Sequence, residues 1–212
     1  KIIAIGSRII PLSTDESTQF SKGQALTKNA DRTKYRTQRK GYDRYQLRRS
    51  LLLEALAKRG MYSGTTLKLT RLELWELRAK AANDQISLIE LGRVLCHINQ
   101  KRGYRTVKSD YGDKKQGDYV SQVLKRHEEI KKLNYTIGEF LYQRLKADQA
   151  FRCKGLIFPR IAYIEEYDKI MGIQKNFYPE ILTEDFIAHV RDYIIFHQRP
   201  LNSCKHLVSE CE

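Results

Sequence analysis

The sequence lacks the features of a membrane protein, a secreted protein or a disulfide-stabilised protein. No apolar run reaches the roughly 18 residues that a transmembrane helix needs, so no membrane partner is expected. The first residues have neither an initiator methionine nor a signal-peptide layout, so we expect a piece cut from a longer chain. Only four cysteines are present, widely scattered, and no disulfide framework follows from their spacing. A reducing cytoplasm is therefore the predicted compartment.

Patterns of catalytic and metal-binding residues are also missing. There is no P-loop, no Ser/His/Asp signature and no carboxylate pair with a clear partner. The five histidines have no ligand spacing, and Cys204, His206 and Cys211 form too weak a set for zinc. His97 faces away from the apolar helical face or lies at its margin, where a structural or polar contact is expected rather than catalysis. The sequence therefore predicts no catalytic residue, no metal site and no cofactor in this chain.

Positive charge is what the sequence has in excess. Lysine and arginine number 39 against 25 acidic residues, a net charge of +14. Residues 1–110 hold 23 basic and 10 acidic side chains, whereas residues 111–212 hold 16 and 15. This asymmetry favours a polyanionic partner on one half over a solvated charged face. With 41% hydrophobic residues the chain can still bury a core, which excludes wholesale disorder.

The hydrophobic pattern predicts a mainly α protein with a short N-terminal β segment. Residues 1–12 favour two short strands, either the edge of a larger sheet or a hairpin covering the helical body. Residues 13–28 are polar and are expected to be irregular. Capping boxes at Ser87 and Thr136 mark two helix starts. The helices are expected at 29–60, with a weak point at Gly41, and at 67–81, 87–103, 118–133, 136–146, 163–171 and 183–196, with an exposed loop at 106–117.

The segment 32–49 carries eight basic side chains and one acid, Asp43. On a helix, the i, i+4 rows of these cations form a basic stripe that winds slowly around the axis. Each like-charge pair destabilises the helix by about 0.2–0.5 kcal/mol, and almost no aliphatic side chain is available to bury before Leu47. Phosphates would neutralise this repulsion, whereas a solvated face or a localisation signal is the alternative. We therefore predict nucleic-acid binding by Arg32, Lys34, Arg36, Arg39, Lys40, Arg44, Arg48 and Arg49.

Two further features accompany this segment. Tyr35, Tyr42 and Tyr45 lie to one side of the stripe and could stack on bases or pack on a neighbouring lobe. A second basic cluster follows a predicted helix C-terminus, where the helix dipole alone would favour cations. The functional interpretation of this cluster is a second phosphate contact beside Tyr104, made by Lys101, Arg102 and Arg105.

Ordered blocks of sequence resemble the type II CRISPR-associated RNA-guided DNA endonucleases (Cas nine), in particular the shorter, subtype II-C-like members. The resemblance covers almost the whole chain. Its blocks are 8–11, the arginine-rich helix that begins at 29, and the runs 75–78, 91–104 and 196–201. Lys101 stands where the family has an arginine, which keeps the charge but loses a fork-shaped contact. The family's catalytic RuvC-type and HNH motifs and its PAM-interacting region are absent from this sequence.

The resemblance implies three parts: a remnant of the RuvC-like strand and linker at 1–28, the bridge helix at 29–60, and a helical recognition lobe at 61–212. It implies that the bridge helix contacts guide-RNA phosphates in the seed region, and that Lys101, Arg102 and Arg105 contact the repeat-derived scaffold. Target DNA would be held as the RNA–DNA heteroduplex.

The resemblance also implies that the parent cuts DNA with Mg²⁺ as an antiviral defence in the bacterial cytoplasm. This piece is not expected to cleave, and the nuclease domains of the parent would be its partners. The alternative is a helical interaction scaffold, for example a docking surface on residues 111–212 for a phage-encoded anti-CRISPR inhibitor.

Overall fold

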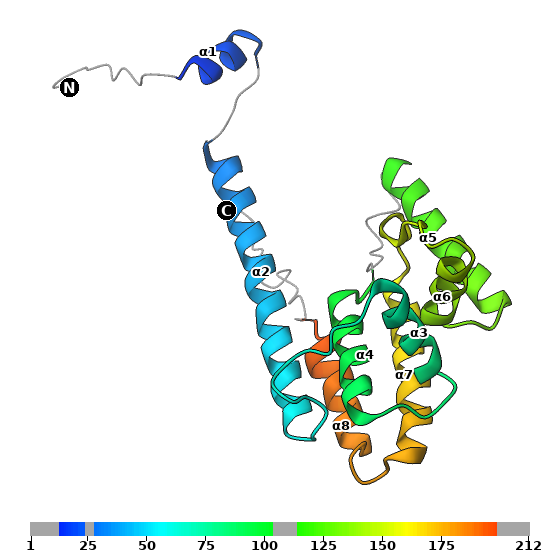
Figure 1. The fold of residues 1–212 in the computed structure, drawn as a ribbon. Helices are drawn as coiled ribbons and strands as arrows, with labels where there is room; N and C mark the ends of the chain where they lie inside the picture. Colours follow the sequence, from blue (N-terminus) through cyan, green and yellow to red (C-terminus); the bar gives the residue numbers. More distant parts are fainter. Residues whose placement is uncertain (1–12, 24–27, 104–113, 199–212) are drawn as a thin grey trace, which may run out of the picture. The chain divides into compact units, whose positions relative to one another are not determined.

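The computed structural model describes residues 13–23, 28–103 and 114–198. The strands predicted over 1–12 lie outside these residues, as do Tyr104, Arg105 and the three zinc candidates. The described residues form helices and no strand, which confirms a mainly α fold (Figure 1). The chain divides into two compact units, Lys1–Gln46 and Leu47–Glu212, which are described separately.

The first unit contains helix α1 (Thr14–Ser21) and the N-terminal part of helix α2 (Lys28–Ala57). The prediction that 13–28 is irregular is wrong for α1. The hydroxyls of Thr18 and Ser21 donate to the carbonyls four residues earlier, over 2.8 and 2.9 Å. These polar side chains are therefore satisfied within the helix instead of directing the backbone into a turn.

Helix α2 is continuous across Gly41 and belongs to both units. It begins one residue before the predicted start and ends three residues before Gly60. Gly60 ends it as expected, with a φ of 69° that a residue without a Cβ adopts readily. The amide of Met61 donates to the carbonyl of Leu56, and the amide of Gly60 donates to that of Ala57. These two bonds satisfy the last carbonyls of the helix.

The second unit is a helical domain built around α3 (Arg71–Ala81). This helix packs against α4 (Leu88–Gln100), α6 (Ile137–Ala147) and α7 (Arg160–Phe177), as Figure 1 shows. Helix α5 (Lys114–Lys132), a 3₁₀ turn (Cys153–Gly155), α8 (Glu184–Ala188) and a π-helix (His189–Ile195) complete it. The apolar face predicted for α4 is buried at Leu91, Val94, Leu95 and Ile98.

Capping boxes set three of the helix starts. The boxes predicted at Ser87 and Thr136 are confirmed: each hydroxyl accepts from the amide three residues on, and that residue's glutamate accepts from the cap amide. A third box at Thr70 was not predicted, so the helix expected at 67–81 begins at Arg71 instead. The same signature stands in the sequence as Thr70 followed by Glu73.

Two helices are longer than the hydrophobic pattern predicts. Helix α5 begins at Lys114, inside the segment 106–117 that was expected to be a loop. Helix α7 continues past Met171 because its next inward residue, Gln174, is fully buried and satisfied. Its amide nitrogen donates to the carbonyls of Ala81 and Asp84 over 2.9 and 2.7 Å. A buried polar side chain therefore interrupts the apolar period without ending the helix.

None of the helices in the described ranges is both long enough and apolar enough to span a bilayer.

Candidate nucleic-acid interface

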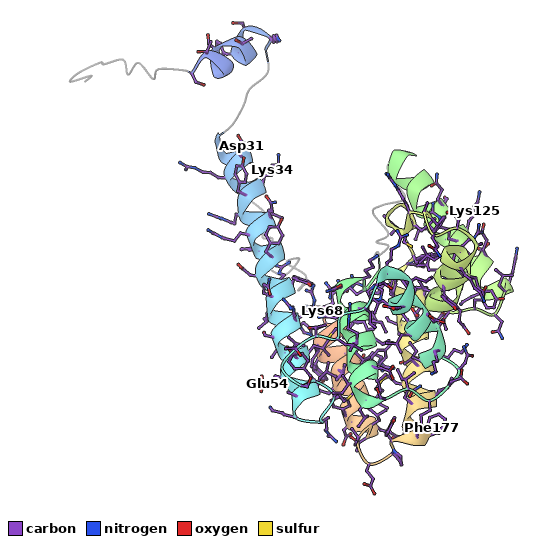
Figure 2. All side chains as sticks on the ribbon, viewed as in Figure 1. Asp31, Lys34, Glu54, Lys68, Lys125 and Phe177 are labelled. Carbon is purple, nitrogen blue, oxygen red and sulfur yellow. The ribbon has the colours of Figure 1, made fainter. Side chains whose placement is uncertain are left out.

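The basic stripe of α2 lies open to solvent in the first unit. Every residue from 31 to 44 is exposed, and Figure 2 shows side chains projecting from this part of the helix around Asp31 and Lys34. Within the part of the chain that the structure describes, the six cations of the stripe in this unit form no ion pair with a carboxylate. The stripe is therefore not neutralised by described residues of its own chain. Its members in this unit are Arg32, Lys34, Arg36, Arg39, Lys40 and Arg44.

Two exposed tyrosine rings accompany the stripe. Tyr35 is 66% exposed and Tyr42 is 63% exposed, and the Gln38 amide donates to the Tyr42 hydroxyl over 3.3 Å. Tyr45 is half-buried. Tyr35 and Tyr42 are thus accessible for stacking, as the sequence suggested.

The second unit brings together three arginines, which we call the arginine cluster: Arg48 of α2, Arg102 in the segment after α4, and Arg160 of α7. All three are half-buried. Burial, followed by the positive charges of Arg48 and Arg160, lowers the pKa of Arg102 to about 10. Arg102 Nη1 donates to the carbonyls of Ile195 and His197, both over 3.2 Å. Arg102 is therefore held in place at a strongly positive position.

Helical spacing explains why Arg48 differs from the other stripe residues. Leu52 and Leu56 lie four and eight residues further along α2 and are buried in the core of the second unit. A residue four positions before Leu52 lies on the same face of the helix, so Arg48 is drawn toward the domain. Its neighbour Arg49 is exposed.

Arg160 was missed by sequence reasoning, although a signal for it exists. It is the first residue of α7 and follows Pro159, which occupies the N-cap. A cation at a helix N-terminus is disfavoured by the helix dipole, so an arginine there calls for a separate explanation. Its Nη1 donates to Gln198 Oε1 over 3.3 Å.

Lys101 makes a different contact from the arginines of this cluster. Its side chain is exposed, with Nζ 5.5 Å from the centre of the Trp75 ring, which favours a cation–π contact. Both the dipole interpretation and the phosphate interpretation of Lys101 are compatible with this position. Arg105, the third predicted member, lies outside the described residues.

A buried polar network lies beneath these basic residues, and sequence reasoning missed it except at His97. Arg78 and Glu166 form an ion pair with both side chains fully buried. His97 lies beside Arg78 and meets the Trp75 ring edge to face, with centroids 4.7 Å apart. Burial, then the charge of Arg78, lowers the pKa of His97 to about 2. His97 is therefore a neutral structural contact, as its position on the helical face predicted.

In the described ranges, no group of three or more His, Cys, Asp or Glu side chains is arranged to hold a metal ion.

The structure thus contains an arginine-rich helix, exposed over residues 31–44, and a helical domain. No protein-family model matches the chain. The CRISPR-associated endonuclease Cas9 of Campylobacter jejuni is 27% identical over 179 residues, a match that covers 74% of this chain and 16% of the relative. The chain thus spans about a sixth of the length of the curated relative it matches.

Solved Cas9 structures share the fold. Campylobacter jejuni Cas9 in complex with sgRNA and target DNA aligns with a TM-score of 0.68 at 23% identity, covering 85% of this chain and 26% of that one. St1Cas9 in a dimeric assembly with sgRNA, tDNA20 and AcrIIA6 aligns with a TM-score of 0.67 at 23% identity, covering 86% and 23%. The chain therefore matches part of Cas9 in sequence and in fold, as the resemblance led us to expect.

Proposed function

We propose that this chain is the bridge helix and part of the recognition lobe of a subtype II-C-like Cas9, and that it binds guide RNA. The observation that carries the proposal is the basic stripe, whose six cations in the first unit are exposed and form no ion pair with described carboxylates. Such a row of like charges is self-repelling in water. An RNA backbone converts the repulsion into phosphate contacts.

The arginine cluster supports the same function in the second unit. Three guanidinium groups near one another create a strongly positive position, which favours the binding of an anion. The phosphate of an RNA strand is an anion of suitable shape for forked guanidinium contacts. The relatives were solved with sgRNA and target DNA, which agrees with a nucleic-acid partner for the corresponding part.

In the parent protein we propose the division 1–28, 29–60 and 61–212 for RuvC remnant, bridge helix and recognition lobe. The RNA–DNA heteroduplex would lie against the lobe, read by its backbone and shape, with sequence left to base pairing. The nuclease domains of the parent would supply DNA cleavage with Mg²⁺, in the bacterial cytoplasm. This chain would contribute binding alone.

The experiment is RNA binding by the 212-residue chain across a range of salt concentrations. The probe is an RNA hairpin with a single-stranded extension, and the measured quantity is the slope of log K against log salt. Replacing Arg36, Arg39 and Arg44 together with alanine should reduce this slope by about two to three, since each lost phosphate contact removes about 0.7–0.9.

A matched control changes three exposed lysines elsewhere in the chain. Lys125, Lys132 and Lys146 are exposed and form no ion pair with described carboxylates. The triple alanine variant of these lysines removes the same charge and should leave the slope within about one unit of the unmodified chain. Equal slopes for all three proteins would contradict the assignment of the stripe.

A second candidate function is a docking surface for an inhibitor protein, because the St1Cas9 neighbour was solved with AcrIIA6. A truncated chain that ends near Lys108 would lack α6 and α7, which contribute to the core. The test of a docking surface on residues 111–212 therefore uses the intact chain. AcrIIA6 is the probe in a pull-down, with Leu133 and Tyr193, which are 53% and 67% exposed, each changed to serine. If the unmodified chain binds AcrIIA6 and these variants do not, the result supports a docking surface. If the unmodified chain does not bind AcrIIA6, this second function is excluded.

A further inference from the structure

One carboxylate inside the second unit joins three helices. Arg78 lies in the last turn of α3 and Glu166 lies in α7. Arg78 Nε donates to Glu166 Oε1 over 2.7 Å, and Nη2 donates to Oε2. Glu166 Oε1 also accepts from the amide of Gly138, at the start of α6, over 2.9 Å. The two-pronged contact therefore fixes α7 against α3 and α6 together.

Helix α4 joins this network through His97. Its Nδ1 lies 3.5 Å from Arg78 Nη1, and the neutral ring can accept there. The guanidinium of Arg78 also lies over two aromatic rings, 5.1 Å from the centre of Trp75 and 5.3 Å from that of Tyr163. The planar group is thus held on its edge by Glu166 and at its face by aromatic rings.

Tyr163 connects the buried pair to the arginine cluster. A Cβ placed on Gly103 would lie 2.6 Å from Tyr163 Cδ2 and 2.8 Å from Arg160 Cα. Gly103 has a φ of 81°, so both its backbone conformation and its surroundings require glycine. The segment after α4 and the first turn of α7 are therefore in direct contact. These are the segments that carry Arg102 and Arg160.

We propose that the buried Arg78–Glu166 pair positions the arginine cluster for RNA by fixing where α7 lies against α3 and α4. This inference rests on the proposed function. A forked guanidinium–carboxylate contact tolerates little sliding between its helices, whereas an apolar contact tolerates more. Like charges drive Arg102 and Arg160 apart, so the fold has to impose their proximity. Arg78 and Glu166 would then act on RNA only through the residues they position.

A double-mutant cycle tests this inference with the full chain and the hairpin RNA. Arg78→Lys keeps the buried positive charge but removes the fork, and Arg160→Ala removes one cluster member. Each change alone should lower RNA affinity by about tenfold, the effect of one charged hydrogen-bonded contact. Together they should lower it by clearly less than the product of the two single losses, because the fork then has no Arg160 left to position.

Arg59→Lys is the matched control. Arg59 is half-buried, lies 5.1 Å from the centre of the Phe186 ring and donates to the Ile181 carbonyl over 3.0 Å. Any effect of this change on affinity should multiply with that of Arg160→Ala. Circular dichroism checks that each variant is folded. If Arg78→Lys unfolds, Glu166→Asp replaces it, since it keeps the charge and withdraws the carboxylate by one methylene.

The possible results distinguish failure of the positioning role of Arg78 and Glu166 from failure of RNA binding itself. Losses that multiply for Arg78→Lys and Arg160→Ala would overturn positioning while leaving RNA binding by the cluster intact. An Arg160→Ala variant that binds RNA normally would also overturn the inference. In that case the salt slope of the Arg36, Arg39 and Arg44 variant decides independently whether the chain binds RNA through α2.

Discussion

Loss of the Glu166 carboxylate should be among the most destabilising single changes in the second unit. In Glu166→Ala, the guanidinium of Arg78 remains fully buried without its counter-ion. Removing one partner of a buried pair destabilises by about 3–5 kcal/mol. The amide of Gly138 also loses its acceptor, a further loss of about 1–3 kcal/mol if no water replaces the carboxylate. These losses share one site and do not add fully, so we expect about 4 kcal/mol.

Chemical denaturation followed by tryptophan fluorescence measures this loss. Trp75 is the only tryptophan in the chain, is 2% exposed and lies against Arg78, so its emission reports on the second unit. The midpoint should fall at unchanged slope, because the surface exposed on unfolding stays nearly the same.

The double variant Arg78→Met, Glu166→Leu supplies the decisive comparison. It replaces the ion pair by apolar side chains of similar volume and leaves no buried charge, so it should recover at least half of the lost stability. A single variant that loses less than about 1 kcal/mol would refute the reasoning, because a truly buried uncompensated charge destabilises by more. A double variant as unstable as the single one would show that the fork, not charge compensation, dominates stability.

Three further results are expected. In Gly92→Ala the new Cβ would lie 2.0 Å from the Met61 carbonyl oxygen, so thermal melting should show a loss of about 1–3 kcal/mol, whereas Gly172→Ala, with nothing within 4 Å, should be neutral or slightly stabilising. For His97, the folded pKa of about 2 lies below the ordinary value of 6.5, so only the unfolded chain gains a proton as the pH falls below 6.5. Between pH 7 and pH 5 the unmodified chain should therefore lose about 2 kcal/mol more than His97→Gln, and equal losses in denaturant titrations would contradict a buried neutral ring. Thr70→Ala should remove the unpredicted capping box at a loss of about 1 kcal/mol, visible as a lower melting temperature, and no change would mean that packing alone sets the start of α3.

Local signals in the sequence account for the helices that were predicted well. Ser87 with Glu90, and Thr136 with Glu139, are capping boxes within one helical turn, so their consequences do not depend on distant residues. The period of Leu91, Val94, Leu95 and Ile98 likewise identifies the buried face of α4. These features follow from neighbouring residues, which is why the pattern alone could predict them.

Features that depend on distant partners could not be predicted in this way. Arg78 and Glu166 are 88 residues apart in sequence, and nothing near either residue indicates the other. Gln174 looks like a surface residue until Ala81 and Asp84 supply its acceptors. In both cases a polar side chain is buried because another helix satisfies it, and the hydrophobic period counts such a residue as exposed.

In the candidate interface, too, the sequence could not predict which residues depend on distant partners. The sequence treats the cations from Arg32 to Arg49 as one set, whereas the structure separates Arg48, which joins Arg102 and Arg160. Which stripe residue turns toward the domain depends on where Leu52 and Leu56 enter the core. Charge counting identifies an exposed basic helix, but the convergence of specific arginines depends on helix packing.

The continuity of α2 explains how a self-repelling segment can be helical without a bound polyanion. Helix formation is limited by its first turn, and each later residue adds one hydrogen bond to an existing helix. Leu52, Leu56 and the bonds around Gly60 hold the C-terminal part of α2 in the core of the second unit. The stripe can therefore extend a helix that already exists instead of nucleating its own. Repulsion among its arginines then weakens the helix without abolishing it, and under the proposed function RNA phosphates would remove the repulsion from a backbone that is already in place.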